Sequence, residues 1–319
     1  MSSLITFQNA GKKVSSSPEL ESGRPNAAQL YLLKLNARQS RLRMKRLIER
    51  TAKIFGFKSM ETCPWHQLTR AEVLALKTML EEEGLAPNTI NLYLSAMRGV
   101  AHEAWIEGWM DDRTYLAIKD VKSERGYREQ KGRALTPVET QRLIRYCSNE
   151  NTPKGSRDAL IFALGVGCGL RRDEIANVKI KNLDLINQEL RIIGKGNKRR
   201  SVFLSGRIIR LVKSWIYHRK LEKGENLLVP IHRFGNIQLR KSMTPDAIYQ
   251  IMVHRASELQ IEKFSPHDLR RTFATRLFEN GADINTVKDA MGHASISTTQ
   301  RYDRRGQERI KEAMQSIKL

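Results

Sequence analysis

The residues able to do chemistry concentrate in one stretch, 264–303, which reads FSPHDLRRTFATRLFENGADINTVKDAMGHASISTTQRYD. It contains two basic clusters, at 267–271 and 292–293, and then a tyrosine, Tyr302. Arginine and histidine side chains stabilise developing negative charge, and a tyrosine oxygen can act as a nucleophile. The combination indicates a nucleophile site for phosphodiester chemistry.

Two segments upstream carry further residue types that this chemistry needs. Arg171 lies in GLRRDEI, with Glu174 one helical turn later. Together with Arg270, this arginine can grip two non-bridging phosphate oxygens in a bidentate geometry that lysine cannot match. The turn GKGNKR offers two lysines, Lys195 and Lys198, and the position between the two glycines favours Lys195.

Each of these residues also has an ordinary structural explanation. His267 and His293 can be capping or buried hydrogen-bonding histidines, and Arg171 can belong to a solvated helix face. A turn lysine such as Lys195 often serves solubility, and Tyr302 can be an amphipathic core residue. Their joint occurrence in one chain favours the catalytic interpretation.

The patterns around the candidates predict the elements that position them. In the key stretch, Ser265 and Pro266 form a typical helix start, apolar residues then recur at helical spacing, and Gly281 ends the helix. The second half of the chain also predicts helices that start at Thr136, at Ser156 or Arg157, just after Gly169, at Ser205 and at about Thr244, with strands over 188–193 and 199–204.

The first half of the chain predicts a separate helical unit. A helical pattern starts at Ala27, and further helices are expected from about 70 to 83 and from 87 to 108. The segment 121–134 is polar, basic and nearly free of apolar residues, which is typical of a linker. The predicted organisation is a flexible tail over 1–26, a helical domain over 27–120, a basic linker over 121–134 and a second domain over 135–319.

A dense group of cations in the helical unit predicts contact with a polyanion. A solvated helix face explains some of them, but the scarcity of acids among them favours a surface that faces phosphates. Asn88 and Asn91, at the start of the helix after Pro87, can contact DNA or can simply cap that helix. On the turn of the second half, Lys198 and Arg199 are further DNA-binding candidates. The cations of the helical unit are Arg38, Arg41, Arg43, Lys45 and Arg46.

The overall charge supports a nucleic-acid partner. The chain has 319 residues, with 56 Lys+Arg against 34 Asp+Glu, a net charge of +22 and a pI near 10.1. Such an excess favours nucleic acid through counterion release. Binding to an acidic membrane would call for one strongly amphipathic basic helix, whereas these cations are spread along the whole chain.

Other features of the composition bear on compartment and cofactors. Cys63, Cys147 and Cys168 are odd in number and far apart, which argues against a disulfide frame or zinc site and for buried cysteines in a reducing compartment. The longest apolar run, 159–170, is shorter than the roughly 20 residues that span a bilayer. With no signal peptide visible, we expect a cytoplasmic, nucleoid-associated protein with no membrane contact.

Four separated motifs, GLRRDEI, GKGNKR, SPHDLRRTFAT and MGHASISTTQRY, together resemble the tyrosine recombinase family. The resemblance covers roughly residues 27–319 and is strongest to the Xer-like and the phage or transposon integrase members. It implies a mainly α fold, with a SAM-like helical domain that binds the core site and a mostly α catalytic domain with a small antiparallel β-sheet, together forming a C-shaped clamp on DNA. The catalytic residues carried over are Arg171, Lys195, His267, Arg270, His293 and Tyr302.

The resemblance also implies roles for these residues. Tyr302 forms a 3′-phosphotyrosine, and Lys195 protonates the leaving 5′ oxygen. His267 assists as base and orienter, His293 donates a hydrogen bond to the phosphate, and Glu174 orients neighbouring groups. No metal and no cofactor is expected, because the cations are part of the chain and the bond energy is kept in the phosphotyrosine.

The expected partners are double-stranded DNA core sites, a homotetramer on two such sites, and accessory DNA-bending proteins. A C-terminal helix from about Gln307, with an apolar stripe from Ile310 to Ile317, can dock on a neighbouring protomer or pack in the core. Arg271 replaces the histidine of many relatives, which we expect to be a tolerated surface change. Two alternatives stay open: a type IB topoisomerase that nicks and reseals, and a DNA-binding accessory protein without catalysis.

Overall fold

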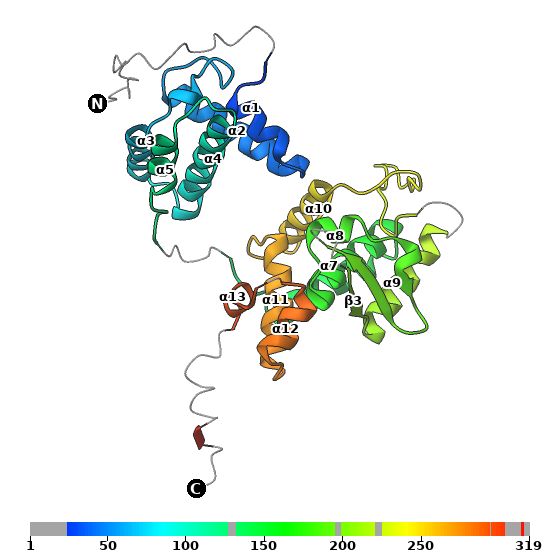
Figure 1. The fold of residues 1–319 in the computed structure, drawn as a ribbon. Helices are drawn as coiled ribbons and strands as arrows, with labels where there is room; N and C mark the ends of the chain where they lie inside the picture. The colour runs from blue at the N-terminus through cyan, green and yellow to red at the C-terminus, as the bar shows by residue number, and fades with distance from the viewer. Residues whose placement is uncertain are drawn as a thin grey trace. The chain divides into compact units, whose positions relative to one another are not determined.

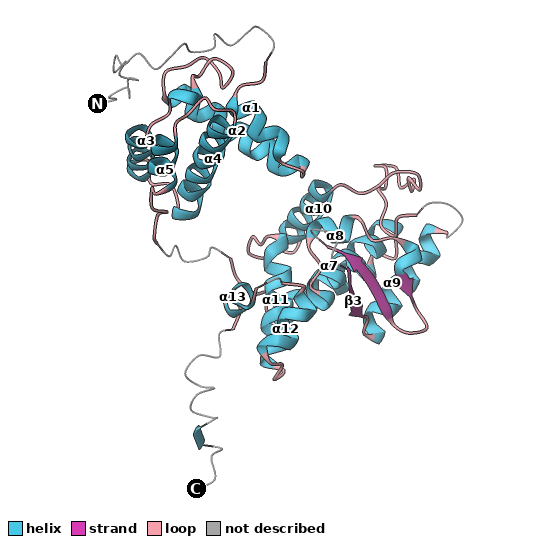
Figure 2. Ribbon diagram, viewed as in Figure 1, coloured by secondary structure: helices cyan, strands magenta, loops and turns pink. Residues whose placement is uncertain are grey.

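The computed structural model describes residues 24–126, 132–194, 199–220, 225–293, 295–303 and 314–315. The chain divides into two compact units, Met1–Gln130 and Lys131–Leu319 (Figure 1). Within the described residues, helices dominate and the strands form one small antiparallel sheet (Figure 2). The predicted fold class, mainly α with a small antiparallel sheet, is confirmed. No described helix is both long enough and apolar enough to cross a bilayer.

The first unit is organised around its longest described helix, α4. The other helices and a 3-10 turn at Trp65–Gln67 all pack on α4 or on its neighbours, and α4 buries residues such as Leu94 and Met97 among them. The helical pattern expected from Ala27 is interrupted at 35–37, so it forms two helices rather than one. The helices are α1 (Ala27–Lys34), α2 (Arg38–Ile54), α3 (Arg70–Glu82), α4 (Pro87–Ile106) and α5 (Asp112–Lys119).

The described start of the expected linker, 121–126, is attached to the first unit. Val121 is buried, and its carbonyl accepts a hydrogen bond from Arg98. The Asn91 side chain donates to the carbonyl of Glu124 at 3.0 Å and accepts from its backbone N–H at 2.7 Å. Lys77 pairs with the Glu124 carboxylate at 2.7 Å.

The described end of that segment, 132–135, is attached to the second unit in the same way. Arg133 forms a forked ion pair with Glu139, and the backbone N–H of Leu135 donates to the hydroxyl of Thr272 at 2.8 Å. The described parts of the expected linker therefore belong to the two units, 121–126 to the first and 132–134 to the second.

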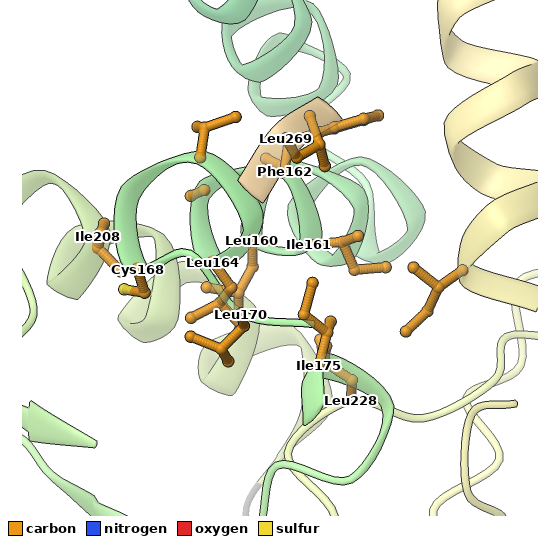
Figure 3. Packing of buried hydrophobic residues seen from close by; sticks show 14 of the residues in the cluster. Leu160, Ile161, Phe162, Leu164, Cys168, Leu170, Ile175, Ile208, Leu228 and Leu269 are labelled. Atoms are coloured by element: carbon orange, nitrogen blue, oxygen red, sulfur yellow. The ribbon is translucent and has the colours of Figure 1, made fainter. Parts of the chain in front are cut away.

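The second unit is built around α7, whose residues from Gly155 to Val166 are all buried. The helices α6, α9 and α11 pack against it. Figure 3 shows Ile208 of α9 and Leu269 of α11 among the buried residues of this core. Gly165 and Gly167 permit this close packing, since a Cβ at either position would lie 2.7 Å from Leu269 or Ile208, respectively. The helices are α6 (Pro137–Asn149), α7 (Pro153–Cys168), α8 (Arg172–Ala176), α9 (Gly206–Arg219), α10 (Pro245–Glu258), α11 (Pro266–Glu279), α12 (Ile284–Met291) and α13 (Ile296–Gln300).

Several expected helix starts differ slightly in the structure. The α7 helix begins at Pro153, earlier than expected, because the Thr152 side chain caps it by accepting from the N–H of Gly155. Ser205 holds the N-cap position of α9, but its side chain makes no capping hydrogen bond. The expected C-terminal helix from about Gln307 lies outside the described residues except at 314–315, which are helical, and Met314 is exposed.

The sheet consists of β1 (Leu183–Asp184), β2 (Glu189–Ile193) and β3 (Arg199–Phe203) in that order. Ile193 pairs with Arg199, so the connection between β2 and β3 spans the expected turn. Alternation along β3 leaves Arg199 exposed and places Arg200 on the same side as the buried Val202.

Candidate active site

Four parts of the second unit bring the described catalytic candidates together with Arg200, which was not predicted as a site residue. These are the start of α8, strand β3, the first turn of α11, and the connection from α12 through α13. The electrostatic effects that Arg171, Arg200, Arg270 and Glu174 exert on His293 place all of these groups in one neighbourhood.

Glu174 is the carboxylate at the centre of this cluster, and its side chain is only 5% exposed. It accepts from the backbone N–H and the guanidinium of Arg171, both at 2.8 Å. Both terminal nitrogens of Arg200 donate to its two oxygens, also at 2.8 Å. Although burial opposes ionisation, the hydrogen bonds from Arg200 and Arg171 hold the pKa of Glu174 at about 2. The carboxylate is therefore ionised and fixes both arginines in place.

Arg270 is a buried cation, only 2% exposed, and is held by two carbonyls at helix ends. Its terminal nitrogens donate to the carbonyls of Gly169, the C-cap of α7, and Met291, the last residue of α12. Burial and the neighbouring charge of Arg171 lower the pKa of Arg270. Among the described residues no carboxylate forms an ion pair with it, so an anion bound beside it would be strongly stabilised.

A glycine permits the arrangement of Arg171 beside Arg270. Gly169 ends α7 in the left-handed conformation, with φ of +61°, and a Cβ there would lie 2.3 Å from the ring of Phe273. Only glycine combines this backbone conformation with such close contact. The end of α7 can therefore approach α11, which brings the start of α8 next to the first turn of α11.

His293 and Tyr302 lie at the two ends of the α13 segment. Their rings are stacked, with centroids 6.0 Å apart and planes inclined by 23°. The Nδ1 atom of His293 is 2.9 Å from the hydroxyl oxygen of Thr299, and the backbone N–H of Tyr302 donates to the Thr299 carbonyl at 2.9 Å. Burial, followed by the charges of Arg270 and the other arginines, lowers the pKa of His293 to about 4. Its ring is therefore neutral at neutral pH.

His267, in the first turn of α11, keeps contact with solvent. Its partial desolvation and the nearby charge of Arg270 lower the pKa of the His267 imidazole, so that it is available as a proton acceptor. Its ring makes no hydrogen bond to another described residue.

The other predicted site residues lie outside this cluster or outside the described residues. Lys195 and Lys198 lie outside the described residues. Arg199 is exposed at the start of β3. In the first unit, Asn88 is exposed, whereas the amide of Asn91 is occupied by the backbone of Glu124 and so serves that unit's own structure. The α2 cations, which are all exposed, are Arg38, Arg41, Arg43, Lys45 and Arg46.

Two arginines have roles that differ from the sequence-based expectation. Arg200 donates two hydrogen bonds to Glu174 but was not among the predicted site residues. The sequence held a signal for it, because Arg200 lies two positions before the apolar Val202 and therefore on the inward side of the predicted strand. The expectation that Arg271 is a surface residue is wrong. Its side chain is 11% exposed and donates to the carbonyl of Gly132 in the segment that enters the second unit.

The described residues offer neither a metal site nor an ionised thiol. Among the described residues, no group of three or more His, Cys, Asp or Glu side chains could hold a metal ion. Cys63, Cys147 and Cys168 are buried free thiols, and burial raises the pKa of each to about 12. These thiols are therefore protonated, as expected for cysteines that serve as small apolar core residues.

Known proteins resemble this chain in sequence. Residues 133–309 match the phage integrase family. Tyrosine recombinase XerD of Listeria monocytogenes is 29% identical over 240 residues, which cover 74% of this chain and 77% of that protein. Tyrosine recombinase XerC of Alcanivorax borkumensis is 30% identical over 243 residues, covering 75% of this chain and 76% of that one.

Solved structures share the fold. The Tn1549 transposon integrase, in complex with transposon right end DNA, matches with a TM-score of 0.68 at 17% identity, covering 92% of this chain and 100% of that chain. The XerH site-specific recombinase bound to palindromic difH substrate, a post-cleavage complex, matches with a TM-score of 0.62 at 22% identity, covering 86% and 77%.

Proposed function

Because this chain belongs to the phage integrase family and is a site-specific tyrosine recombinase, we propose that the cluster around Glu174 is its reaction centre. The observation that carries this assignment is the charge balance beside Tyr302. Arg171 and Arg200 share the Glu174 carboxylate, whereas Arg270 nearby forms no ion pair with a carboxylate of the described residues. Because the neighbouring His293 is neutral, the site keeps an unbalanced positive charge that suits a phosphodiester.

The reaction follows from these groups. The Tyr302 oxygen attacks the phosphorus and forms a bond to it, while the bond from phosphorus to the 5′ oxygen breaks. The phenolic proton passes to a base, for which we assign His267, and the 5′ oxygen takes a proton from Lys195. The product is a 3′-phosphotyrosine and a free 5′-hydroxyl, and attack by a second 5′-hydroxyl reverses the step and joins the strands.

The chain's own cations stabilise the transition state. Arg171 and Arg270 present N–H groups to the non-bridging oxygens that gain charge during attack. Glu174 keeps Arg171 in orientation through its two hydrogen bonds, and Arg200 in turn holds Glu174. His293 donates the further hydrogen bond to the phosphate.

The biological reaction requires partners beyond one chain. We assign double-stranded DNA core sites as the substrate, with exchange of strands in pairs through a Holliday junction in a homotetramer on two sites. Docking of the C-terminal helix on a neighbouring protomer, closure of the two units on DNA as a C-shaped clamp, and help from DNA-bending proteins remain predictions. The basic face of α2 and the exposed Asn88 are the proposed DNA contacts of the first unit.

A suicide substrate tests the assignment. A binding site is first selected from random-sequence duplexes and then nicked beside the scissile phosphate, so that the cleaved strand is lost and the covalent intermediate accumulates. Wild type in the presence of a chelator should give a covalent protein–DNA adduct, and Tyr302→Phe should bind equally well without forming one. Binding without an adduct from wild type would leave a DNA-binding protein on a recombinase scaffold.

A further inference from the structure

Thr299 is a buried residue of α13 that contacts both His293, before this helix, and Tyr302, after it. The residue is 0% exposed and its hydroxyl oxygen is 2.9 Å from Nδ1 of His293. Its carbonyl accepts the backbone N–H of Tyr302 at 2.9 Å. The first interaction depends on the side chain and the second on the backbone, so a substitution can remove one without the other.

The hydroxyl hydrogen of Thr299 decides the direction of the first hydrogen bond. Nδ1 of His293 is the partner that the described residues provide for this hydroxyl. A buried hydroxyl that only accepted would leave its own hydrogen unsatisfied, which is costly. The Thr299 hydroxyl therefore donates to Nδ1, and Nδ1 acts as the acceptor.

Because of the charges around His293, the direction of this hydrogen bond decides which ring nitrogen carries the proton. Arg171 at α8, Arg200 on β3 and Arg270 on α11 all oppose protonation of the ring, and Glu174 opposes them only in part. The ring therefore carries a single N–H. When Nδ1 accepts from Thr299, that N–H must be on Nε2.

We propose that Thr299 is a positioning residue for strand cleavage, because its hydroxyl holds His293 in the tautomer whose Nε2–H donates to a non-bridging oxygen of the scissile phosphate. This inference rests on the proposed function of the site. Without the hydroxyl, the proton is free to occupy Nδ1, and Nε2 would then present a lone pair to an anion.

Single-turnover cleavage of the suicide substrate tests the proposal with two matched variants. Thr299→Val removes the hydroxyl while keeping the shape and the backbone carbonyl, and Thr299→Ser keeps the hydroxyl. We expect Thr299→Val to cleave about tenfold more slowly or worse, with unchanged DNA affinity, and Thr299→Ser to stay near wild type. In a His293→Ala background the valine substitution should cause no further loss, because its effect passes through the imidazole.

A cleavage rate of Thr299→Val equal to wild type, a serine variant as slow as valine, or an undiminished loss in the His293→Ala background would overturn the proposal. Should Thr299→Val fail to fold, nitrogen NMR of histidine-labelled wild-type protein decides, since the shifts report which ring nitrogen carries hydrogen. Hydrogen on Nε2 supports the proposal and hydrogen on Nδ1 contradicts it. Absence of an adduct from wild type would instead refute the proposed function.

Discussion

Single residues set the charge of the reaction centre. Glu174 is shared between Arg171 and Arg200, whereas Arg270 is held by the carbonyls of Gly169 and Met291. Carbonyls orient a guanidinium without cancelling its charge. The buried Arg270 thus keeps its full attraction for a phosphate. The Glu174 carboxylate keeps the more exposed Arg171 in place.

The first prediction concerns the titration of His293. In the free protein its pKa is lowered to about 4, so the ring should stay neutral from pH 8 down to about pH 5. A bound phosphate favours the charged form and should raise this pKa. In the unfolded chain a histidine titrates near pH 6.5, so acidification from about pH 6.5 towards 4 destabilises the folded state at this residue.

NMR of histidine-labelled protein measures this directly, with His293→Gln to assign the resonance. The expected result is a midpoint well below 6.5 in free protein and a higher one with bound duplex. A midpoint near 6.5 in the free protein would show that neither burial nor the three arginines lower the pKa of this ring.

At the scale of elements, one ion pair joins the sheet to α8. The fork from Arg200 to Glu174 joins β3 to the start of α8. Because β3 is also one arm of the hairpin whose connection contains Lys195, the same fork positions the base of that hairpin beside the site. The side chains are 12% and 5% exposed, so this is a largely buried pair.

The second prediction compares neighbouring arginines on β3. Arg200→Ala leaves the buried Glu174 with Arg171 as its remaining guanidinium partner, and should cost about 3 kcal/mol of stability. The cleavage rate should also fall, because Arg171 loses its orientation. Arg199→Ala, on the exposed side of the strand, should change stability by less than about 0.5 kcal/mol.

Thermal unfolding and single-turnover cleavage measure the two effects. Adding Glu174→Gln to Arg200→Ala should recover part of the lost stability, since it removes the buried carboxylate that has lost one of its two guanidinium partners. Equal behaviour of the two arginine variants would contradict the role that we give to the fork.

Side chains of both units hold the described ends of the segment that connects them. Arg98, Asn91 and Lys77 hold 121–126 on the first unit. Arg271, in the same α11 turn as Arg270, holds Gly132 on the second. Gly132, near the start of the second unit, is therefore held next to α11.

At the scale of the whole molecule, the net charge of +22 is the dominant property. Some of the positive charge is neutralised within the first unit, as in the pair between Arg50 and Glu83. The exposed α2 cations Arg43 and Arg46 form no ion pair with another described residue. They are therefore available to displace counterions from DNA.

The third prediction follows from this availability. The double variant Arg43→Ala/Arg46→Ala should bind its DNA site more weakly, and the slope of log affinity against log salt should become shallower by about one for each DNA phosphate that the protein no longer neutralises. Arg113→Ala, an exposed arginine on α5, is the matched control and should leave the slope nearly unchanged. Fluorescence anisotropy across a salt series measures both. An unaltered slope in the double variant would remove α2 from the DNA-binding surface.

Local sequence by itself predicted the mainly α fold class and most helix starts, and it indicated where the candidate site lies. Helix starts such as Ser265–Pro266 and Thr136–Pro137 depend on capping chemistry within four residues, which is readable from the chain. The break between α1 and α2 was missed because the helical spacing continues across it. The sequence motifs were also enough to indicate a reaction centre containing His267, Arg270, His293 and Tyr302.

Only the tertiary structure decided how those residues are held. Arg200 meets Glu174 across 26 positions of chain, and Arg271 meets Gly132 across 139, so neither partner could be predicted from local pattern. Asn91 was a candidate for DNA contact or for capping its helix, yet its side-chain amide binds the backbone of Glu124 instead. The roles of polar side chains depend on partners that lie far away in the sequence, and folding alone brings those partners together.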